Sequence, residues 1–254
     1  MKNLAKKIKL GKDTRTVLIF YLLFVIIFSL GKGIYDFSKS QNHKTKSAKT
    51  TEVKKESKPK VVKIQKPVIK ESALLTVPYT VQAPLVNWNI HEESCEEAAL
   101  LMIHYYLAGS QLVIIPPVTA NQELVNMRSW QISHYGSEKD LNMYRTGKLA
   151  QDYYGYKYEV TEDVTADNIK LAISEGNPVL VPVITHALLN PHYGRQPSYH
   201  ILVIKGYYPG GIITNDAGVK EGRSYFYTWD ILWQAIDAQT KQMNQGRDML
   251  VVTK

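Results

Sequence analysis

The chain has 254 residues, of which 31 are Lys or Arg and 23 are Asp or Glu, so its formal net charge is +8. This charge is divided unevenly: residues 1–75 hold 18 basic and 5 acidic side chains, whereas residues 76–254 hold 13 and 18. A nucleic-acid-binding domain needs positive charge on its folded surface, so the acidic globular part argues against a nucleic-acid partner. The single cysteine, Cys95, excludes an internal disulfide framework.

The N-terminus has the pattern of a signal anchor. A basic segment, 1–15, precedes an apolar run, and we predict a transmembrane helix over 16–35. Six basic residues before the run compare with five close behind it, so the positive-inside rule is nearly balanced. An N-terminal anchor followed by a large domain usually places that domain outside. We therefore predict a single-pass cell-membrane protein with an extracytoplasmic C-terminal domain, with a cleaved signal peptide as the alternative.

Residues 36–73 are rich in Lys, Ser and Thr and are predicted to be a disordered linker. Such a composition buries too little apolar surface to offset the entropy of ordering. Contact of its lysines with anionic lipid or cell-wall polymer is one interpretation, and a solvated tether is the other.

The composition becomes globular at Leu74, and a single domain is predicted over 74–254. Apolar residues at helical spacing predict helices over 94–107, 138–154 and 166–175. Apolar runs bounded by turn residues predict strands over 178–184, 199–207, 211–216, 224–228 and 249–253, with a helix from about Trp229 before the last strand. Helices first and strands later indicate an α+β fold, with a helix packed on an antiparallel sheet.

Cys95 lies at the start of the first predicted helix, and we expect it to be a catalytic nucleophile. Ser94 and Glu97 have the spacing of a capping box, which would place the sulfur in the first helical turn, where the helix dipole favours thiolate. Four glutamates surround the cysteine and should instead raise the thiol pKa: Glu92, Glu93, Glu96 and Glu97. A nearby imidazolium would therefore be needed to keep a thiolate at neutral pH.

Among seven histidines, His200 alone lies inside a predicted strand, which would hold its ring rigidly. A buried structural histidine is the simpler interpretation of that residue alone. The turn at 209–211 returns the next strand beside it, so Asp216 at the end of that strand should approach His200. The carboxylate would then orient the imidazole and stabilise the imidazolium.

An oxyanion donor completes such a site, and Gln82, thirteen residues before Cys95, is the candidate. Asn87, Trp88 and Tyr199 are the candidate substrate-binding residues, and the loop 186–198 is expected to line the cleft with residues near Trp130.

These residues resemble the stand-alone bacterial cysteine peptidases similar to the double-glycine, bacteriocin-processing peptidase domains. The resemblance covers nearly all of 76–254 and rests on six segments: 77–84, 88–89, 94–102, 176–183, 199–207 and 214–218. It implies a papain-like fold in which Cys95 is the nucleophile, His200 the base, Asp216 its orienting group and Gln82 the oxyanion donor. Many members have Cys-Gly-Pro and Asp-Pro-Gly where this chain has Cys95-Glu-Glu and Asp216-Ala-Gly, so the substrate is left open.

The sequence thus predicts a membrane-anchored cysteine peptidase that acts on a peptide or protein substrate and uses no cofactor or metal. Two alternatives remain open: a cell-wall peptide hydrolase on the same fold, and a catalytically silent peptide-binding module.

Overall fold

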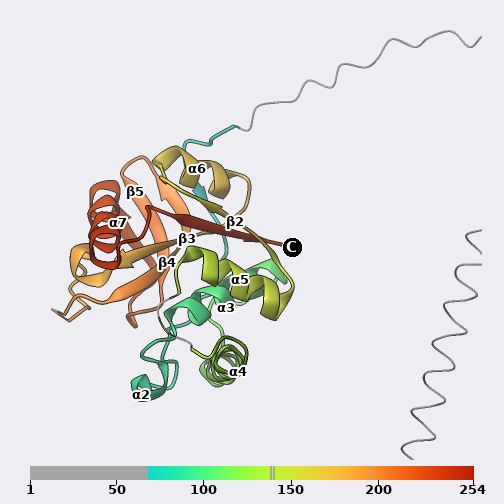
Figure 1. The fold of residues 1–254 in the computed structure, drawn as a ribbon. Coiled ribbons are helices and arrows are strands. Elements are labelled where there is room, and N and C mark those ends of the chain that lie inside the picture. Colours follow the sequence, from blue (N-terminus) through green and yellow to red (C-terminus); the bar gives the residue numbers. More distant parts are fainter. Residues whose placement is uncertain (1–67, 138, 140, 195) are drawn as a thin grey trace, which may run out of the picture. The chain divides into compact units, whose positions relative to one another are not determined.

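The computed structural model describes residues 68–137, 139, 141–194 and 196–254, which form a sheet covered by helices (Figure 1). The predicted basic segment, the predicted transmembrane helix and most of the predicted linker fall within residues 1–67 and lie outside this described part.

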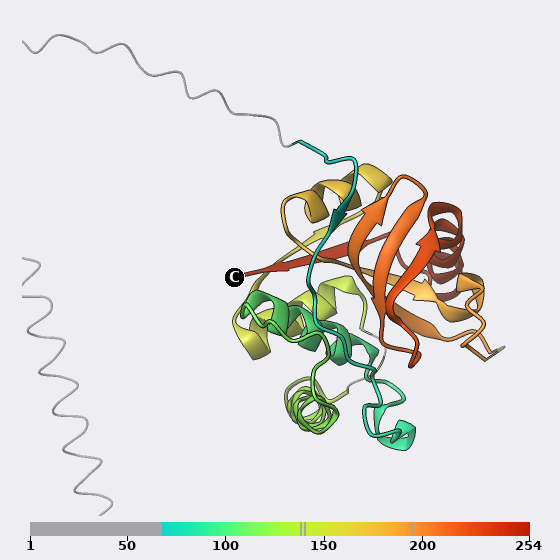
Figure 2. The same ribbon diagram turned by 180° about the vertical axis from the view of Figure 1, so that it is seen from behind.

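Within the described residues, seven strands form one antiparallel sheet, in the order β2-β7-β3-β4-β5-β6, with β1 paired to β4. The strands are β1 (Ala73–Leu74), β2 (Lys157–Thr161), β3 (Val179–Ile184), β4 (Tyr199–Tyr208), β5 (Gly211–Asp216), β6 (Arg223–Thr228) and β7 (Met249–Thr253). β4 and β5 are neighbours in the sheet and form a long hairpin, which Figure 2 shows from behind.

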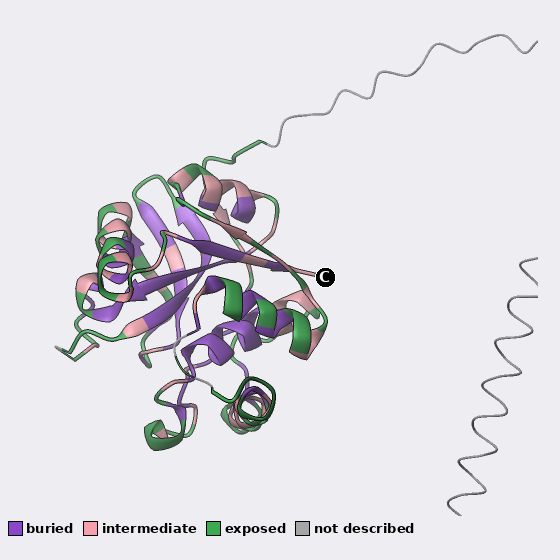
Figure 3. Ribbon diagram, in the orientation of Figure 1, coloured by how far each residue is buried: buried purple, intermediate pink, exposed green. Residues whose placement is uncertain are grey.

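The helices are α2 (Trp88–His91), α3 (Cys95–Leu107), α4 (Pro117–Tyr135), α5 (Met143–Tyr154), α6 (Ala166–Ser174) and α7 (Trp229–Met243), with a 3-10 helix, η1 (Thr185–Leu188). Successive residues of β3 point to opposite faces of the sheet. Leu180 packs in one core with residues of α3, α4 and α5, whereas Val179 and Val181 pack in a second core with α6 and α7. β3 is therefore buried on both faces along its whole length, and the centre of the sheet is mostly purple in Figure 3.

Local sequence explains where several helices begin and end. Asn142 caps α5 by accepting a hydrogen bond from the Arg145 N–H, and Gly155 ends that helix in the left-handed conformation that glycine adopts without a steric penalty. A capping box of Thr165 and Asn168 opens α6.

The predicted α+β fold is confirmed, and most predicted elements are present. The helix predicted from 138 begins instead at Met143, because Asn142 forms its cap. The sequence prediction missed α4, the longest helix among the described residues, whose buried face carries only four residues: Ala120, Leu124, Met127 and Gln131. It also missed β2, a strand whose residues are only partly buried.

The domain begins before the predicted boundary at 74. Ala73 pairs with Tyr207 in the sheet, the Tyr207 hydroxyl donates to the Lys70 carbonyl at 2.6 Å, and the Lys70 N–H donates to Ser174 Oγ at 3.1 Å. The last residues of the predicted linker, 68–73, are therefore part of the folded unit.

The predicted membrane localisation needs correction. Across residues 68–254 as described, no helix is both long and apolar enough to cross a membrane. We therefore do not retain the predicted single-pass localisation. The segment that suggested it, 16–35, lies outside the described residues.

Candidate active site

Cys95 is the first residue of α3, as the sequence predicted, and only 5% of its surface is exposed. The predicted capping box is not formed. Ser94 makes no side-chain cap bond, because its hydroxyl is hydrogen-bonded to His91 Nδ1 at 3.0 Å instead. Glu97 accepts a hydrogen bond from Gln131 on α4 and so does not reach back to the cap. The position of the Cys95 thiol is thus set by the packing of the first turn of α3, whose residues are buried.

The carboxylate next in sequence contacts the sulfur directly. Cys95 Sγ donates to Glu96 Oε2 at 2.9 Å, and the Leu141 N–H donates to Glu96 Oε1 at 2.6 Å. Glu96 is 1% exposed. The acidic surroundings expected from the sequence therefore include a carboxylate within hydrogen-bond distance of the thiol.

His200 and Asp216 are paired, as the hairpin predicted. His200 Nε2 and Asp216 Oδ1 are 2.9 Å apart, and both side chains are almost completely buried. The register places Asp216 opposite Leu202, two residues beyond His200 on β4. Because Nε2 is occupied by the carboxylate, Nδ1 is the ring nitrogen that remains for the chemistry.

The Asp216 carboxylate is held by three further donors. The Tyr193 hydroxyl and the Gly218 N–H donate to Oδ1 at 2.5 and 3.1 Å, and the Tyr227 hydroxyl donates to Oδ2 at 2.7 Å. Burial raises the pKa of Asp216, but the hydrogen bond and charge of His200 and the two hydroxyls outweigh burial, so its pKa lies below the ordinary value. Asp216 is therefore held as an anion against the imidazole.

Tyr193 interacts both with the His200–Asp216 pair and with Cys95. Burial raises its pKa well above the ordinary value, and the charge of Asp216 and, more weakly, that of Cys95 add to this effect. Its ring centroid is 5.9 Å from that of His200. Tyr193 thus lies beside the pair and within electrostatic reach of the sulfur.

The segment before α2 is tied to the end of β5. The Tyr79 hydroxyl donates to the Asp216 carbonyl at 3.1 Å, and the Gln82 N–H donates to the Ala217 carbonyl at 2.9 Å. The Gln82 side-chain amide Nε2 donates to the carbonyls of His91 and Glu92, each at 3.0 Å. Both amide hydrogens of Gln82 are therefore directed at the loop that leads into α3.

A cleft of about 280 Å³ lies beside His200 and Gln82. Its lining residues are Gln82, Trp88, Glu92, Thr185, Tyr193, Gly194, Gln196, Ser198, Tyr199, His200 and Gly218. Trp88 and Tyr199 thus lie in its wall, and from the loop 186–198 four residues do so: Tyr193, Gly194, Gln196 and Ser198. Asn87 does not. Its side chain is bonded to Asn121 and to the Leu85 N–H, which makes it a turn residue. Trp130 does not line the cleft either. Its ring stacks on that of His134, with the ring centroids 4.0 Å apart.

Sequence reasoning missed Tyr193 and Tyr227 as site residues. On β6, Tyr227 is buried between two exposed neighbours, so the strand period could have pointed to an inward-facing side chain at this position. Tyr193 lies in the loop expected to line the cleft, but nothing in its neighbours signals a bond to Asp216.

Comparisons with known proteins show the family of the chain and support its fold. The model of the Peptidase C39-like family matches residues 74–243. The structure is similar to that of a protein described as a C39-like peptidase from Bacillus anthracis, at 14% identity and a TM-score of 0.50, covering 73% of this chain and 98% of that one. It is less similar to xylellain, a cysteine protease from Xylella fastidiosa, at 12% identity and a TM-score of 0.37, covering 74% and 87%. No curated protein matches the sequence.

Proposed function

Because the chain belongs to the Peptidase C39-like family and is a cysteine peptidase, we propose that it hydrolyses peptide bonds through Cys95, His200 and Asp216. One observation supports the assignment of roles: His200, paired with the buried Asp216 at 2.9 Å, lines the same cleft as Glu92, which lies just before the Cys95 helix. A carboxylate-oriented imidazole is the group that activates a cysteine nucleophile.

The reaction is an acyl transfer. The Cys95 thiolate attacks the substrate carbonyl, and the carbonyl electrons move to its oxygen. The tetrahedral intermediate then collapses, the C–N bond breaks, and the His200 imidazolium gives its proton to the leaving amine. Water, deprotonated by the neutral imidazole, hydrolyses the thioester and frees Cys95.

The oxyanion needs donors aimed at the position of the developing charge. The Cys95 backbone N–H is one candidate, since it lies in the first turn of α3, where the helix dipole favours negative charge. Gln82 is the other. To serve, its amide must give up one of its two bonds to the carbonyls of His91 and Glu92 when substrate binds. Gln82 therefore links oxyanion binding to the loop before α3.

The test uses the full-length protein, a mixture of unrelated peptides and purified cell-wall peptides. We expect peptide cleavage by the wild type and a loss of about a hundredfold or more in His200→Ala, as for removal of a general base. A histidine outside the cleft, His104, which lies in the last turn of α3 and is hydrogen-bonded to the Tyr156 hydroxyl, supplies the control, and His104→Gln should retain turnover. Cleavage of wall peptides alone would identify a cell-wall hydrolase, and absence of any cleavage would favour a silent binding module.

A further inference from the structure

The contact between Cys95 and Glu96 has chemical consequences beyond the proposed triad. One Glu96 oxygen is fixed by the Leu141 N–H at 2.6 Å, which directs the other oxygen to the sulfur at 2.9 Å. The Tyr199 hydroxyl donates to the Leu141 carbonyl at 2.7 Å. Tyr199 precedes His200 on β4, so the backbone that positions Glu96 is itself held by the strand that carries the proposed base.

A thiol can donate its proton to a carboxylate, but a thiolate in the same place would meet a like charge at hydrogen-bond distance. In a site shielded from water that repulsion is far larger than on a surface. Because Glu96 is 1% exposed, solvent screens it little. The thiolate is therefore compatible with Glu96 only when the carboxyl carries the proton.

We propose that Glu96 controls the nucleophile by sharing one proton with Cys95: the sulfur stays a thiol while Glu96 is a carboxylate, and the thiolate forms when this proton moves to the carboxyl group. The S–H bond of Cys95 breaks and an O–H bond forms at Glu96 Oε2. The electron pair stays on sulfur, and the net charge of the two side chains remains −1. The protonated carboxyl then donates a hydrogen bond to the thiolate, opposite the His200 imidazolium.

Titratable groups near this pair come from other elements. The loop after η1 brings Tyr193 within electrostatic reach of Cys95, and β4 carries His200, which is paired with Asp216. On α3 itself, the Glu97 side chain turns to Gln131 on α4.

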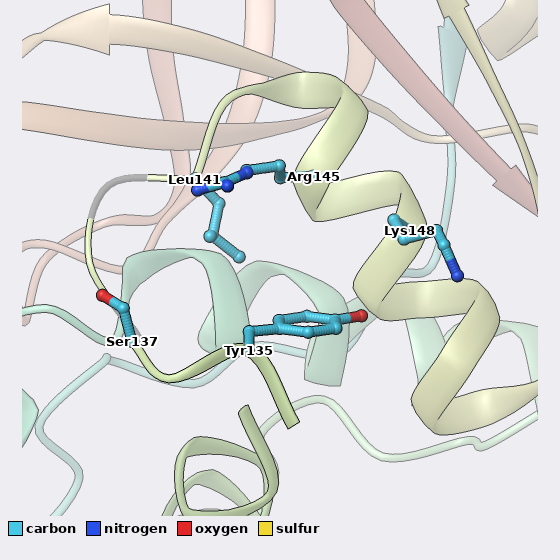
Figure 4. A pocket seen from close by; sticks show the side chains of 5 residues that line it. All are labelled: Tyr135, Ser137, Leu141, Arg145 and Lys148. Atoms are coloured by element: carbon cyan, nitrogen blue, oxygen red, sulfur yellow. The ribbon is translucent and has the colours of Figure 1, made fainter. Parts of the chain in front are cut away.

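Leu141 also lines another pocket, of about 220 Å³, together with Tyr135, Ser137, Arg145 and Lys148 (Figure 4). Lys148 there is paired with Asp152, and Arg145 borders the pocket. The carboxylate of Glu96 is in hydrogen-bond contact with the Cys95 sulfur.

The shared proton predicts a particular pH dependence. With protons on both His200 and the Cys95–Glu96 pair, a fraction of the sulfur is thiolate. As pH rises and one proton is lost, the remaining proton settles on sulfur against the Glu96 carboxylate, and reactivity falls. At still higher pH the thiol ionises and reactivity returns, because the coupled groups titrate as a unit.

The inference rests on the proposed function but can be tested without any peptide substrate. Cys95 is the only cysteine of the chain, so iodoacetamide alkylation of the full-length protein reports on it alone. The rate is measured from acid to alkaline pH in wild type, Glu96→Gln and Glu97→Gln. Glu97 is the matched control, since it is equally buried and adjacent but bonded to Gln131.

We expect Glu96→Gln to raise the alkylation rate near neutral pH about tenfold or more, because the amide donates to thiolate at every pH. The variant should also lack the dip, which is the fall in alkylation rate that precedes the rise at alkaline pH. Glu97→Gln should follow the wild type. Equal profiles in wild type and Glu96→Gln, or equal changes in both variants, would overturn the proposal. If Glu96→Gln does not fold, the wild-type profile decides: a dip supports the proposal and a single rise refutes it. Failure of peptide cleavage with the dip present would refute the proposed function alone.

Discussion

Tyr227→Phe tests whether the buried hydroxyl groups hold the catalytic carboxylate. The Tyr227 hydroxyl donates to Asp216 Oδ2 at 2.7 Å and accepts from Asn190 Nδ2 at 2.7 Å, and the residue is 2% exposed. Removing the oxygen deletes one bond to a charged group, worth about 1.5–3 kcal/mol, and one neutral bond, worth about 0.5–1.5 kcal/mol. Since water does not easily replace the lost donor, we expect a free energy of unfolding lower by about 2–4 kcal/mol.

The same substitution should reduce peptide turnover, because Asp216 with one donor fewer binds the imidazolium from a less fixed position. The assay is urea unfolding of the full-length protein, followed by kcat/KM at one pH. Tyr225→Phe, on the same strand, is the control, since its hydroxyl makes no hydrogen bond in the described part of the chain. Equal stability losses in both variants would refute the reasoning.

Two further predictions concern the same carboxylate. Because the folded pKa of Asp216 is lowered, its contribution to stability is present above the ordinary carboxyl pKa and is lost as pH falls through the folded value. The stability difference between wild type and Asp216→Asn should therefore shrink on going from pH 7 to below about pH 4, as measured by urea unfolding; a constant difference would contradict the lowered pKa. Gly218→Ala would place a methyl group 2.1 Å from the Tyr193 hydroxyl, so it should displace that hydroxyl from Asp216 and lower turnover. Gly210→Ala, with no atom within 4 Å of the added carbon, should leave turnover unchanged, and equal turnover in the two variants would count against a role for Tyr193.

The pairing of His200 with Asp216 could be predicted because it depends on local sequence. The turn at Pro209 and Gly210 joins two adjacent strands, and the strand period then brings the end of one beside the start of the other. The register shift between Ile204 and Gly206 was not visible, yet it changes the pairing too little to separate the two side chains.

The remaining parts of the site depend on contacts between elements far apart in the chain. Tyr193 and Tyr227 approach Asp216 from separate elements, and no local pattern specifies that convergence. The bonds from the Gln82 amide to the carbonyls of His91 and Glu92 were not predicted either, because no local pattern specifies them.

The Cys95 neighbourhood shows a limit of motif reasoning. The spacing of Ser94 and Glu97 fits a capping box, but tertiary partners outweighed it, His91 for the serine and Gln131 for the glutamate. The sequence correctly indicated an acidic environment for the thiol. It could not indicate that Glu96, among four glutamates, contacts the sulfur, because that depends on the Leu141 backbone.

The most direct test of the proposed mechanism is to trap the acyl-enzyme. The full-length protein is mixed with a cleaved peptide, quenched in acid within a single turnover, digested and analysed by mass spectrometry. We predict an acyl group from the substrate on Cys95 in the wild type and its absence in His200→Ala. Peptide hydrolysis with no adduct on Cys95, or an undiminished adduct in His200→Ala, would contradict the assignment of nucleophile and base.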